Sequence, residues 1–399
     1  MGSVPPAPGT DLGPVADAAG DAAGFVHVGD RFDDDMRYLS RFDGPDRPYA
    51  LVVAGDRAVL CAPGLFVEQA RREFVADAPD DGVAREVRTA NLDAPAGRRA
   101  AVALADLTGG DGAGSDDEET VLVPQHLPHD AAVYLERAGY ELRSTEAVAR
   151  ARRTKSAAER DRHRVVQTAA AAGMRRAEAV LAAAEPVGDD LLWDGAALTT
   201  ERLRREVNAV LAAEGVRDAG NTVVGAGESC ADLHFTGTDD VRPGETVLLD
   251  VSPRDPHGYY GDLTRTFVVD GDGGWARRAH VACDDARDVA LQELEAGVTA
   301  ESVHQAAATE LAAYGFPTGD DAGFVHGVGH GVGVSLHEAP SLTADEPLRT
   351  GDVVTVEPGV YDPDRGGVRI EDLVAVTEDG YELLAEYPIS TTPRPAAED

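Results

Sequence analysis

Five residues in the C-terminal part of the chain have the side chains that a pair of divalent metal ions requires. They are Asp250, Asp262, His330, Glu357 and Glu371. Four carboxylates and one imidazole supply the mixed oxygen and nitrogen donors that hold two such ions, and paired ions activate water for hydrolysis. The residue types therefore indicate a metal-dependent hydrolase.

The two aspartates lie in segments that predict a β-hairpin. A run of apolar residues ends at Asp250, and a turn rich in proline and glycine separates it from a second run that contains Asp262. Opposed positions on one face of a hairpin lie a few ångströms apart, so both aspartates could reach one ion or bridge two. The alternative is that they are ordinary acids near a turn of an acidic protein.

The histidine belongs to a glycine-rich segment, HGVGHGVGVSLHE, that runs from His326 through His330 to His337 and Glu338. Alternating glycines allow the backbone to pass very close to another group. The GxGxGxG spacing differs from the GxGxxG of nucleotide-binding loops, and no lysine follows it, which disfavours a nucleotide site. A structural cluster of three histidines is the other alternative.

The two glutamates stand among apolar residues typical of strands. Glu357 follows Val356, and Glu371 follows Ile370. A carboxylate in such a setting is unfavourable unless a cation or a base compensates it. For Glu371 the alternative is an ion pair with Arg369, which points to the same side of a strand, although Arg369 could also support a metal ligand.

Helices and strands are expected to alternate around these residues. Periodicity predicts helices near 166–181, 203–211, 275–296 and 301–314, and strands at 245–251, 259–269, 352–357 and 367–376. Shorter strands at 49–54 and 57–61 and a helix at 66–74 are predicted earlier in the chain. The charged segment 148–164 predicts a domain boundary. We therefore expect a flexible segment over residues 1–23, an N-terminal domain over 24–150 and a catalytic domain over 151–399, with a flexible acidic loop at 109–119.

The composition excludes several classes of partner. The chain has 399 residues and a formal net charge of −36, from 72 acidic and 36 basic residues, and Lys155 is its only lysine. Nucleic acid and anionic membranes would be repelled, so neither is expected as a partner. The acids are dispersed among apolar periodicities, which suggests a folded, halophilic protein with an acidic surface.

Cysteine usage and the absence of targeting signals favour a cytoplasmic location. Cys61, Cys230 and Cys283 are far apart, and no CxxC pair occurs, so neither a zinc knuckle nor a disulfide framework is indicated. The N-terminal residues lack a basic region followed by an apolar run, and no apolar stretch is long enough for a membrane span.

In this order the motifs resemble those of the pita-bread metallopeptidases, which include methionine aminopeptidases, aminopeptidase P and prolidase. The matching motifs are the hairpin of Asp250 and Asp262 with its DxTRT sequence, HGxGHGxGxxxHExP, EPGxY and GxRIED. The resemblance covers about residues 155–385. Residues 24–147 look like the smaller creatinase-type N-terminal domain. The implied fold class is α/β (α+β), with a mixed α/β N-terminal domain and a C-terminal pita-bread domain.

The resemblance also implies roles for the five residues. Asp250 would bind one divalent ion, Asp262 and Glu371 would bridge two ions, and His330 and Glu357 would complete the second site. The ions would be manganese, with cobalt, iron or zinc as alternatives. A metal-bridging hydroxide would attack the substrate, with Glu357 as the proton acceptor.

Further residues receive roles from the same resemblance. His234 and His337 would hydrogen-bond the developing oxyanion and the substrate around the scissile nitrogen. His326 would support the ligands or transfer a proton. Arg369 and Thr264 would lie behind the metal ligands and orient them.

The expected activity is that of an Xaa-Pro aminopeptidase, which removes an N-terminal residue ahead of proline. The N-terminal domain favours this activity over methionine aminopeptidase. An Xaa-Pro dipeptidase (prolidase) is the alternative, and a non-catalytic binding protein on the same fold is a second one. A creatinase-like activity is disfavoured, because it does not require the metal ligands. The expected substrates are short peptides with proline in the second position, and the expected assembly is a homodimer.

Overall fold

The computed structural model describes residues 9–89, 94–109, 119–271, 273–319 and 322–395. The chain forms two compact units, Pro6–Arg152 and Arg153–Asp399. The boundary falls inside the charged segment 148–164. None of the described helices is long and apolar enough to cross a membrane.

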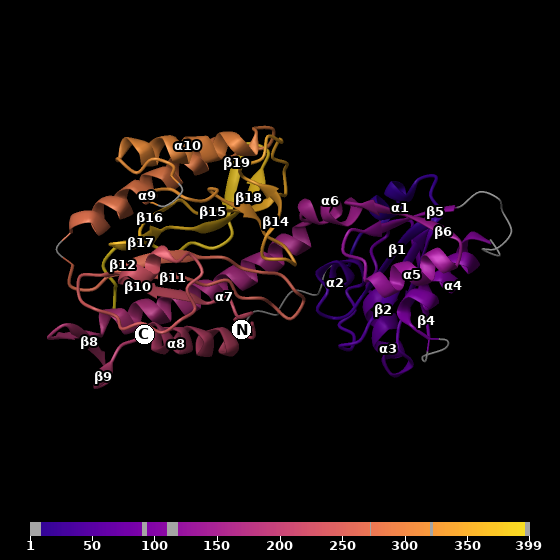
Figure 1. Ribbon diagram of the computed structural model, residues 1–399, viewed down its shortest axis with the longest axis horizontal. Coiled ribbons are helices and arrows are strands. Elements are labelled where there is room, and N and C mark those ends of the chain that lie inside the picture. Colours follow the sequence, from indigo (N-terminus) through magenta and orange to yellow (C-terminus); the bar gives the residue numbers. More distant parts are fainter. Residues whose placement is uncertain (1–8, 90–93, 110–118, 272, 320–321, 396–399) are drawn as a thin grey trace. The chain divides into compact units, whose positions relative to one another are not determined.

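A six-stranded mixed sheet forms the centre of the N-terminal unit (Figure 1). Its strands are β1 (Gly24–Gly29), β2 (Tyr49–Ala54), β3 (Arg57–Cys61), β4 (Ala84–Arg88), β5 (Glu119–Pro124) and β6 (Tyr140–Thr145), in the order β4-β3-β2-β1-β5-β6. The described α-helices are α1 (Gly13–Ala19), α2 (Asp34–Ser40), α3 (Val67–Ala70), α4 (Ala96–Thr108), α5 (His129–Arg137) and α6 (Ala147–Arg153), the last ending at the boundary between the units. Short helical segments η1 (Gly64–Phe66) and η2 (Arg71–Ala76) flank α3, so the helix predicted at 66–74 is confirmed as a helical segment that is not α-helical throughout. β1 pairs with β2 antiparallel and with β5 parallel.

The two faces of β1 pack differently. Val26 and Val28 belong to a core cluster with residues of α4 and α5, such as Leu104 and Leu135. Because successive side chains of a strand point to opposite faces, His27 lies on the other face of the sheet. His27 is fully buried there.

An ordered helix replaces part of the segment that we expected to be flexible. Residues 13–19 form α1, and Leu12 and Val15 before and within it are fully buried. With Ala19 they follow helical spacing, so burial of this stripe outweighs the high content of proline, glycine and alanine. Residues 1–8 and most of the acidic tract 109–119 lie outside the described residues.

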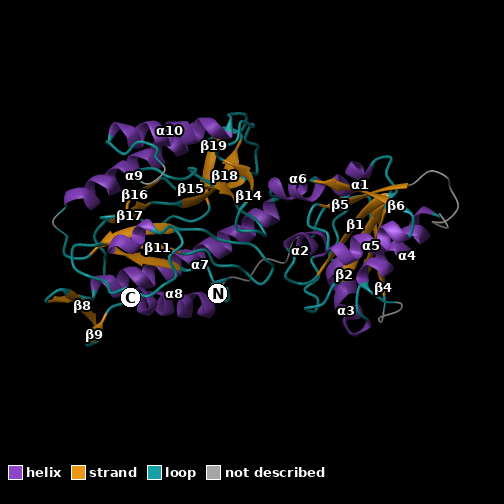
Figure 2. Cartoon of the chain, viewed as in Figure 1, coloured by secondary structure: helices purple, strands orange, loops and turns teal. Residues whose placement is uncertain are grey.

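Two helix pairs and several small sheets form the C-terminal unit (Figure 2). The helices are α7 (Ala157–Ala182), α8 (Thr200–Ala213), α9 (Gly274–Glu293) and α10 (Ala300–Ala313). The strands of the site are β10 (Val223–Ala226), β11 (Thr246–Asp250), β12 (Thr264–Val268), β13 (His330–Gly331), β14 (Glu338–Ser341), β15 (Val353–Val356), β16 (Gly359–Asp362), β17 (Gly366–Arg369), β18 (Asp372–Thr377) and β19 (Gly380–Leu383). A separate small sheet holds β7 (Glu185–Val187), β8 (Asp190–Trp193) and β9 (Ala196–Ala197).

The helix pairs pack on the two sides of the central strands (Figure 1). In α7, Gly173 leaves room for Val207 and Leu211 of α8. Residues of α9 and α10 share a core cluster with β15 to β18, to which Val356, Val368 and Ile370 contribute. The four predicted helices are confirmed, and the alternation of helices and strands confirms the α/β class.

Two predicted strands are shorter or interrupted. The strand expected at 259–269 is β12, which begins only at Thr264, because the preceding residues form the connection that carries Asp262. The strand expected at 367–376 is two strands, since β17 pairs with β16 whereas β18 pairs with β15. Glu371 lies at this break, where it forms an isolated bridge with Thr264.

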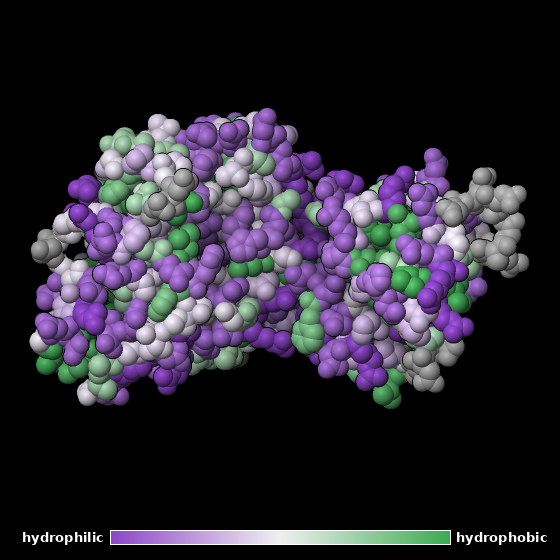
Figure 3. Space-filling view, viewed as in Figure 1, coloured by the Kyte–Doolittle hydropathy of each residue, from purple (hydrophilic) through white to green (hydrophobic). Residues whose placement is uncertain are grey.

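The outer surface agrees with the composition. Hydrophilic residues cover most of the visible face, with scattered hydrophobic ones (Figure 3). Cys61, Cys230 and Cys283 are buried and free, and burial raises the pKa of the Cys230 thiol to about 11. A neutral buried thiol fits a packing role.

Candidate metal centre

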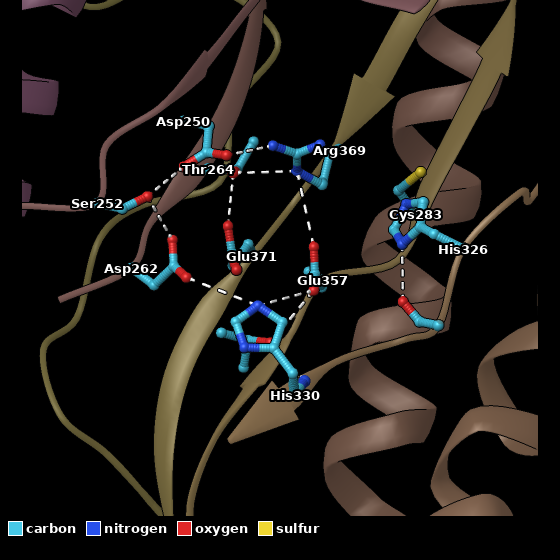
Figure 4. Close-up of polar contacts among 12 residues, drawn as sticks. Asp250, Ser252, Asp262, Thr264, Cys283, His326, His330, Glu357, Arg369 and Glu371 are labelled. Carbon is cyan, nitrogen blue, oxygen red and sulfur yellow. Dashed lines mark hydrogen bonds and ion pairs between the residues drawn. The ribbon is translucent and has the colours of Figure 1, made fainter. Parts of the chain in front are cut away.

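The β11–β12 hairpin positions the two aspartates. The predicted hairpin is confirmed, but Asp250 at the end of β11 lies opposite Thr264, and Asp262 lies two residues before this partner. The side chains converge on Ser252, whose Oγ lies 2.9 Å from Oδ1 of Asp250 and 3.0 Å from Oδ1 of Asp262. Ser252 therefore holds the two carboxyl groups side by side (Figure 4).

The glycine-rich segment brings His330 to the same place. A Cβ atom on Gly329 would lie 2.1 Å from the carbonyl oxygen of Thr355, and one on Gly331 would lie 2.3 Å from that of Ala339. The close approach predicted from the glycines is thus to the backbone of neighbouring segments. It allows the amide of Glu357 to donate to the carbonyl of Val328, 2.8 Å away, which sets Glu357 beside His330.

The imidazole of His330 is oriented as a ligand. Its Nδ1 lies 3.1 Å from the carbonyl oxygen of Gly331, which can only accept, so Nδ1 carries the proton. In the neutral ring Nε2 has the lone pair that a metal ion needs, and this atom lies 3.5 Å from Oε1 of Glu357 and 3.9 Å from Oδ2 of Asp262. A histidine that donates through one nitrogen to a backbone carbonyl is typical of metal coordination through the other.

Threonine hydroxyls orient the two glutamates. Thr355 Oγ1 donates to Oε1 of Glu357 over 3.3 Å, and Thr264 Oγ1 donates to Oε2 of Glu371 over 2.6 Å. Figure 4 shows Glu371 next to Asp262, and Glu357 beside His330. Asp262, His330 and Glu371 each offer one donor atom within 4.8 Å of the others.

The carboxyl groups are too close and too buried to be ionised together without a cation. Burial, followed by the charges of Glu371 and Asp250, raises the pKa of Asp262 well above its ordinary value. Burial raises the pKa of Glu357 to about 7, despite the opposing effect of Arg369. Burial and the charge of Glu357 raise the pKa of Glu371 to about 8. Divalent cations would supply the missing positive charge, so the donor set fits a metal centre.

One guanidinium supports the centre from behind. Arg369 Nη2 donates to Oδ2 of Asp250 over 2.5 Å, and its Nε donates to Thr264 Oγ1 over 3.2 Å. The alternative of a direct pair between Arg369 and Glu371 is not what the structure shows, since Glu371 is bonded to Thr264. Arg369 and Thr264 thus lie behind the acids, where the resemblance placed them.

A chain of hydrogen bonds links Arg369 to His326. Arg369 Nη1 donates to Oη of Tyr361 over 3.0 Å. His326 Nδ1 lies 2.7 Å from the carbonyl oxygen of Gly327, so Nδ1 is the donor. Nε2 therefore accepts from the hydroxyl of Tyr361 over 3.1 Å. Burial and then the charge of Arg369 lower the pKa of His326 to about 3, so this imidazole is neutral.

His234 and His337 line the same cavity, which has a volume of about 330 Å³. His234 and His337 are exposed, in contrast to the largely buried acids. The ring centroid of His337 lies 4.2 Å from that of His330. Burial and then the charge of His330 lower the pKa of His337. The structure therefore brings the predicted site residues to one cavity, except Thr264, which lies behind Glu371 and does not line it.

Sequence reasoning gave no role to three residues of the site. They are Ser252, Thr355 and Tyr361. Tyr361 was visible as part of the EPGxY motif, but nothing in its spacing shows that it bridges Arg369 and His326. Ser252 lies two residues after Asp250, which in an extended segment places it on the same side, and this spacing was a usable signal.

The family model of metallopeptidase family M24 matches residues 161–378. The chain is 36% identical over 178 residues to a probable dipeptidase PepE of Mycobacterium tuberculosis, which covers 44% of this chain and 46% of that protein. It is 35% identical over 173 residues to an Xaa-Pro dipeptidase of Pyrococcus furiosus, with 43% of this chain and 48% of that protein covered. The matches span about half the length of these relatives.

Solved structures match over nearly the whole chain. The dipeptidase PepE from Mycobacterium ulcerans is 29% identical, with a TM-score of 0.76 and 96% of each chain covered. An X-Pro aminopeptidase from Thermotoga maritima is 20% identical, has a TM-score of 0.77 and covers 94% of this chain and 99% of its own, which shows a shared fold alone. These matches confirm the resemblance and the pita-bread fold. With more than half of its residues matched by the family model, the chain belongs to metallopeptidase family M24.

Proposed function

We propose that this protein is a metallopeptidase that hydrolyses the bond before proline in short peptides with a free N-terminus. The observation that carries the proposal is the convergence of four carboxyl groups with the free Nε2 of His330 at one cavity. Carboxylates that buried and that close are stable together only with cations, and a peptidase of this family uses such cations.

The proposed ligands are the five residues of the metal centre. Asp250, Asp262, His330, Glu357 and Glu371 would hold two divalent ions, for which we propose manganese. Bound divalent ions lower the pKa of water towards about 7 and polarise a carbonyl group. Thr264, Thr355 and Ser252 fix the carboxyl orientations through the hydrogen bonds described above.

The histidines around the cavity would act on the substrate. His337 has a lowered pKa and is therefore neutral near pH 7, so it offers one N–H group for the oxygen on which charge develops. His234 lines the same cavity and would contact the substrate near the scissile nitrogen. His326 is held in one tautomer by Tyr361 and Gly327, and we assign it a supporting role. Glu357 is the proposed proton acceptor.

Proline specificity is supported by the names of the relatives and by the cavity. The amide before proline lacks an N–H group, so a site that recognises it needs no acceptor at the scissile nitrogen. A cavity of about 330 Å³ is at the small end of the range of ligand pockets, which fits a short peptide. The expected aminopeptidase and the alternative dipeptidase differ only in the peptide length that they accept, and the names of the relatives favour the dipeptidase.

We propose that the N-terminal unit is the creatinase-type domain and that the protein is a cytoplasmic homodimer. We also propose that its acidic surface is an adaptation to high salt. The net charge of −36 supports the last point, because salt screens repulsion between like charges.

The test is a substrate panel at high salt with added Mn²⁺. It compares Xaa-Pro dipeptides, longer peptides that begin with Xaa-Pro and matched Xaa-Ala peptides. Hydrolysis of the Xaa-Pro peptides but not the Xaa-Ala peptides is expected, and activity confined to dipeptides would select the dipeptidase. Absence of hydrolysis by protein with verified bound metal would refute the peptidase, and would favour a non-catalytic binding protein.

A further inference from the structure

A second group of potential metal donors lies in the N-terminal unit. His27 in β1, Asp33 after β1 and His126 after β5 each place one donor atom within 4.8 Å of the others. β1 and β5 are parallel neighbours, so their C-terminal ends meet at the same edge of the sheet (Figure 1). The sheet topology thus brings together two imidazoles and a carboxylate that are far apart in the sequence.

The separation of His126 and Asp33 is close to that of two donors around a tetrahedral ion, whereas His27 and Asp33 lie at hydrogen-bonding distance and would move apart by about 0.6 Å on binding. Nε2 of His27 lies 2.7 Å from Oδ1 of Asp33, and Nε2 of His126 lies 3.6 Å from Oδ2 of Asp33. Donor atoms around tetrahedral zinc, at about 2.0–2.1 Å from the ion, are separated by about 3.3 Å. Nε2 of His126 also lies 3.5 Å from Oδ2 of Asp35, which adds a second negative charge beside the group.

Two of the three donors are held in place by the surrounding structure. His27 is fully buried, and its ring lies edge to face with that of His126, with centroids 5.3 Å apart. Asp33 Oδ1 also accepts from the amide of Met36 at the start of α2. Arg152 holds Asp35 in place, because its Nη1 donates to Oδ1 of Asp35 over 2.6 Å. Only His126 is exposed, so it can close over an ion that enters from solvent.

A structural ion pair alone does not account for this arrangement. The bond between His27 and Asp33 would be complete without His126. Nevertheless Nε2 of His126 faces two carboxyl groups at distances that are long for hydrogen bonds and that leave room for a shared ion. Burial on its own would raise the pKa of Asp33, but His27 and the amide of Met36 outweigh it and hold this pKa below its ordinary value. The carboxylate is therefore charged at neutral pH.

We propose that His27, Asp33 and His126 form a mononuclear site for zinc or a chemically similar transition-metal ion, separate from the centre of the C-terminal unit. Two imidazoles and one carboxylate are a donor set that zinc uses, and nickel, cobalt and copper accept the same donors. The ion ties β1, the start of α2 and the segment between β5 and α5 together. Nδ1 of His27 is buried without a hydrogen-bond partner among the described residues, so it lacks the acceptor that strengthens a histidine ligand.

The experiment uses the full-length protein with Asp262→Asn and Glu371→Gln, which disable the other centre. After removal of metal and a check of folding by circular dichroism, the protein is titrated with Zn²⁺ by calorimetry. Co²⁺ is used in parallel, because its visible absorption reports tetrahedral nitrogen and oxygen ligands. One Zn²⁺ per chain is expected, with a Co²⁺ spectrum of a four-coordinate site.

Three further substitutions in this background locate the site. His126→Ala removes an exposed donor and is expected to weaken Zn²⁺ binding by at least about 10-fold. Asp33→Asn keeps an N-capping side chain for α2 while removing the charge, and is expected to weaken binding as much. His129→Ala removes another exposed histidine three residues from His126 and is expected to leave the affinity unchanged.

Two outcomes would overturn the proposal. One is the absence of Zn²⁺ binding to the folded protein with the disabled centre. The other is binding that is reduced equally by His126→Ala and His129→Ala, since this would show adventitious binding to surface histidines. Neither outcome bears on the proposed peptidase, whose ligands lie in the other unit.

Discussion

Two groups of histidine and acidic residues differ in how the fold shifts the pKa values of their carboxyl groups. One is the metal centre, and the other is the N-terminal group of His27, Asp33 and His126. In the metal centre, burial and neighbouring acids raise the pKa values of Asp262, Glu357 and Glu371. In the N-terminal group, His27 and a backbone amide lower the pKa of Asp33. The difference shows that the acids of the metal centre are buried beside one another, whereas Asp33 is stabilised as a carboxylate by its hydrogen bonds.

This contrast has consequences for metal binding. At the centre, an ion relieves repulsion among buried acids, so the energetic gain on binding is large. At the N-terminal group, an ion must displace the proton that His27 shares with Asp33, so the gain is smaller. The following changes test the contrast, beginning with the largest expected effect.

Glu371→Gln should abolish catalysis. The substitution keeps the shape of the side chain but removes a proposed bridging carboxylate, and the remaining acids hold fewer ions. We expect kcat/KM for an Xaa-Pro peptide to fall by more than about 1000-fold, since metal activation of water is lost. Metal content per chain, measured on the same sample, should fall as well. Full activity with less bound metal would contradict the assigned role.

Metal removal should make stability depend on pH in a characteristic direction. The pKa of Glu371 is about 8 in the folded protein and 4.5 ordinarily. A carboxyl group whose pKa is raised by folding stabilises the fold at pH values below 4.5, and this contribution is lost as the pH rises through 8. The unfolding free energy of metal-free protein should therefore fall by up to about 4 kcal/mol between pH 5 and pH 8.

Denaturant titrations across this pH range would measure the fall. The many other acids of the chain also repel one another as the pH rises, so the metal-free Glu371→Gln protein is the matched control and should show a smaller fall. Saturation with Mn²⁺ should remove most of the fall. Equal pH slopes for the two metal-free proteins would show that Glu371 is not protonated in the fold.

Arg369→Lys should weaken catalysis without removing the ligands. A lysine cannot donate hydrogen bonds to Asp250, Thr264 and Tyr361 at the same time, because its single ammonium group lacks the planar, forked guanidinium of arginine. Loss of such support for a metal ligand lowers activity or metal affinity by about 10–100-fold. Arg365→Lys, at an exposed arginine in the turn between β16 and β17, is the matched control. Similar effects of both substitutions would mean that Arg369 has no specific supporting role.

Asp33→Asn should have the smallest effect, and its pH dependence should have the opposite sign. In the presence of EDTA, loss of the charged bond to His27 should lower the unfolding free energy by about 1–2 kcal/mol at pH 7, while the asparagine still caps α2. Because folding lowers the pKa of Asp33, this contribution is lost as the pH falls through that pKa, below the ordinary value of 3.8. A difference between the two proteins that grows with acidification would contradict this account.

Sequence reasoning reached the metal centre because its residues lie in segments with strong local signals. The glycines around His330 showed that the backbone must pass close to a neighbour, and the structure shows that the neighbour is the backbone at Thr355. Sequence reasoning did not reach the partners of Arg369, since its hydrogen bonds to Asp250 and Tyr361 depend on how the three strands β11, β16 and β17 meet. The break at Glu371 was also missed, because strand pairing and not local preference divides β17 from β18.

The sequence by itself determined the donor set, the order of its motifs and the membership of a family, because these depend on residue type and short-range spacing. The tertiary structure decided the neighbours, the burial and the protonation of each of these donor residues. The proton position on His330, the raised pKa of Glu371 and the meeting of His27 with His126 all arise from burial and contacts between segments that are distant in the sequence. Electrostatic effects depend on distance and on burial, and only the folded chain sets both.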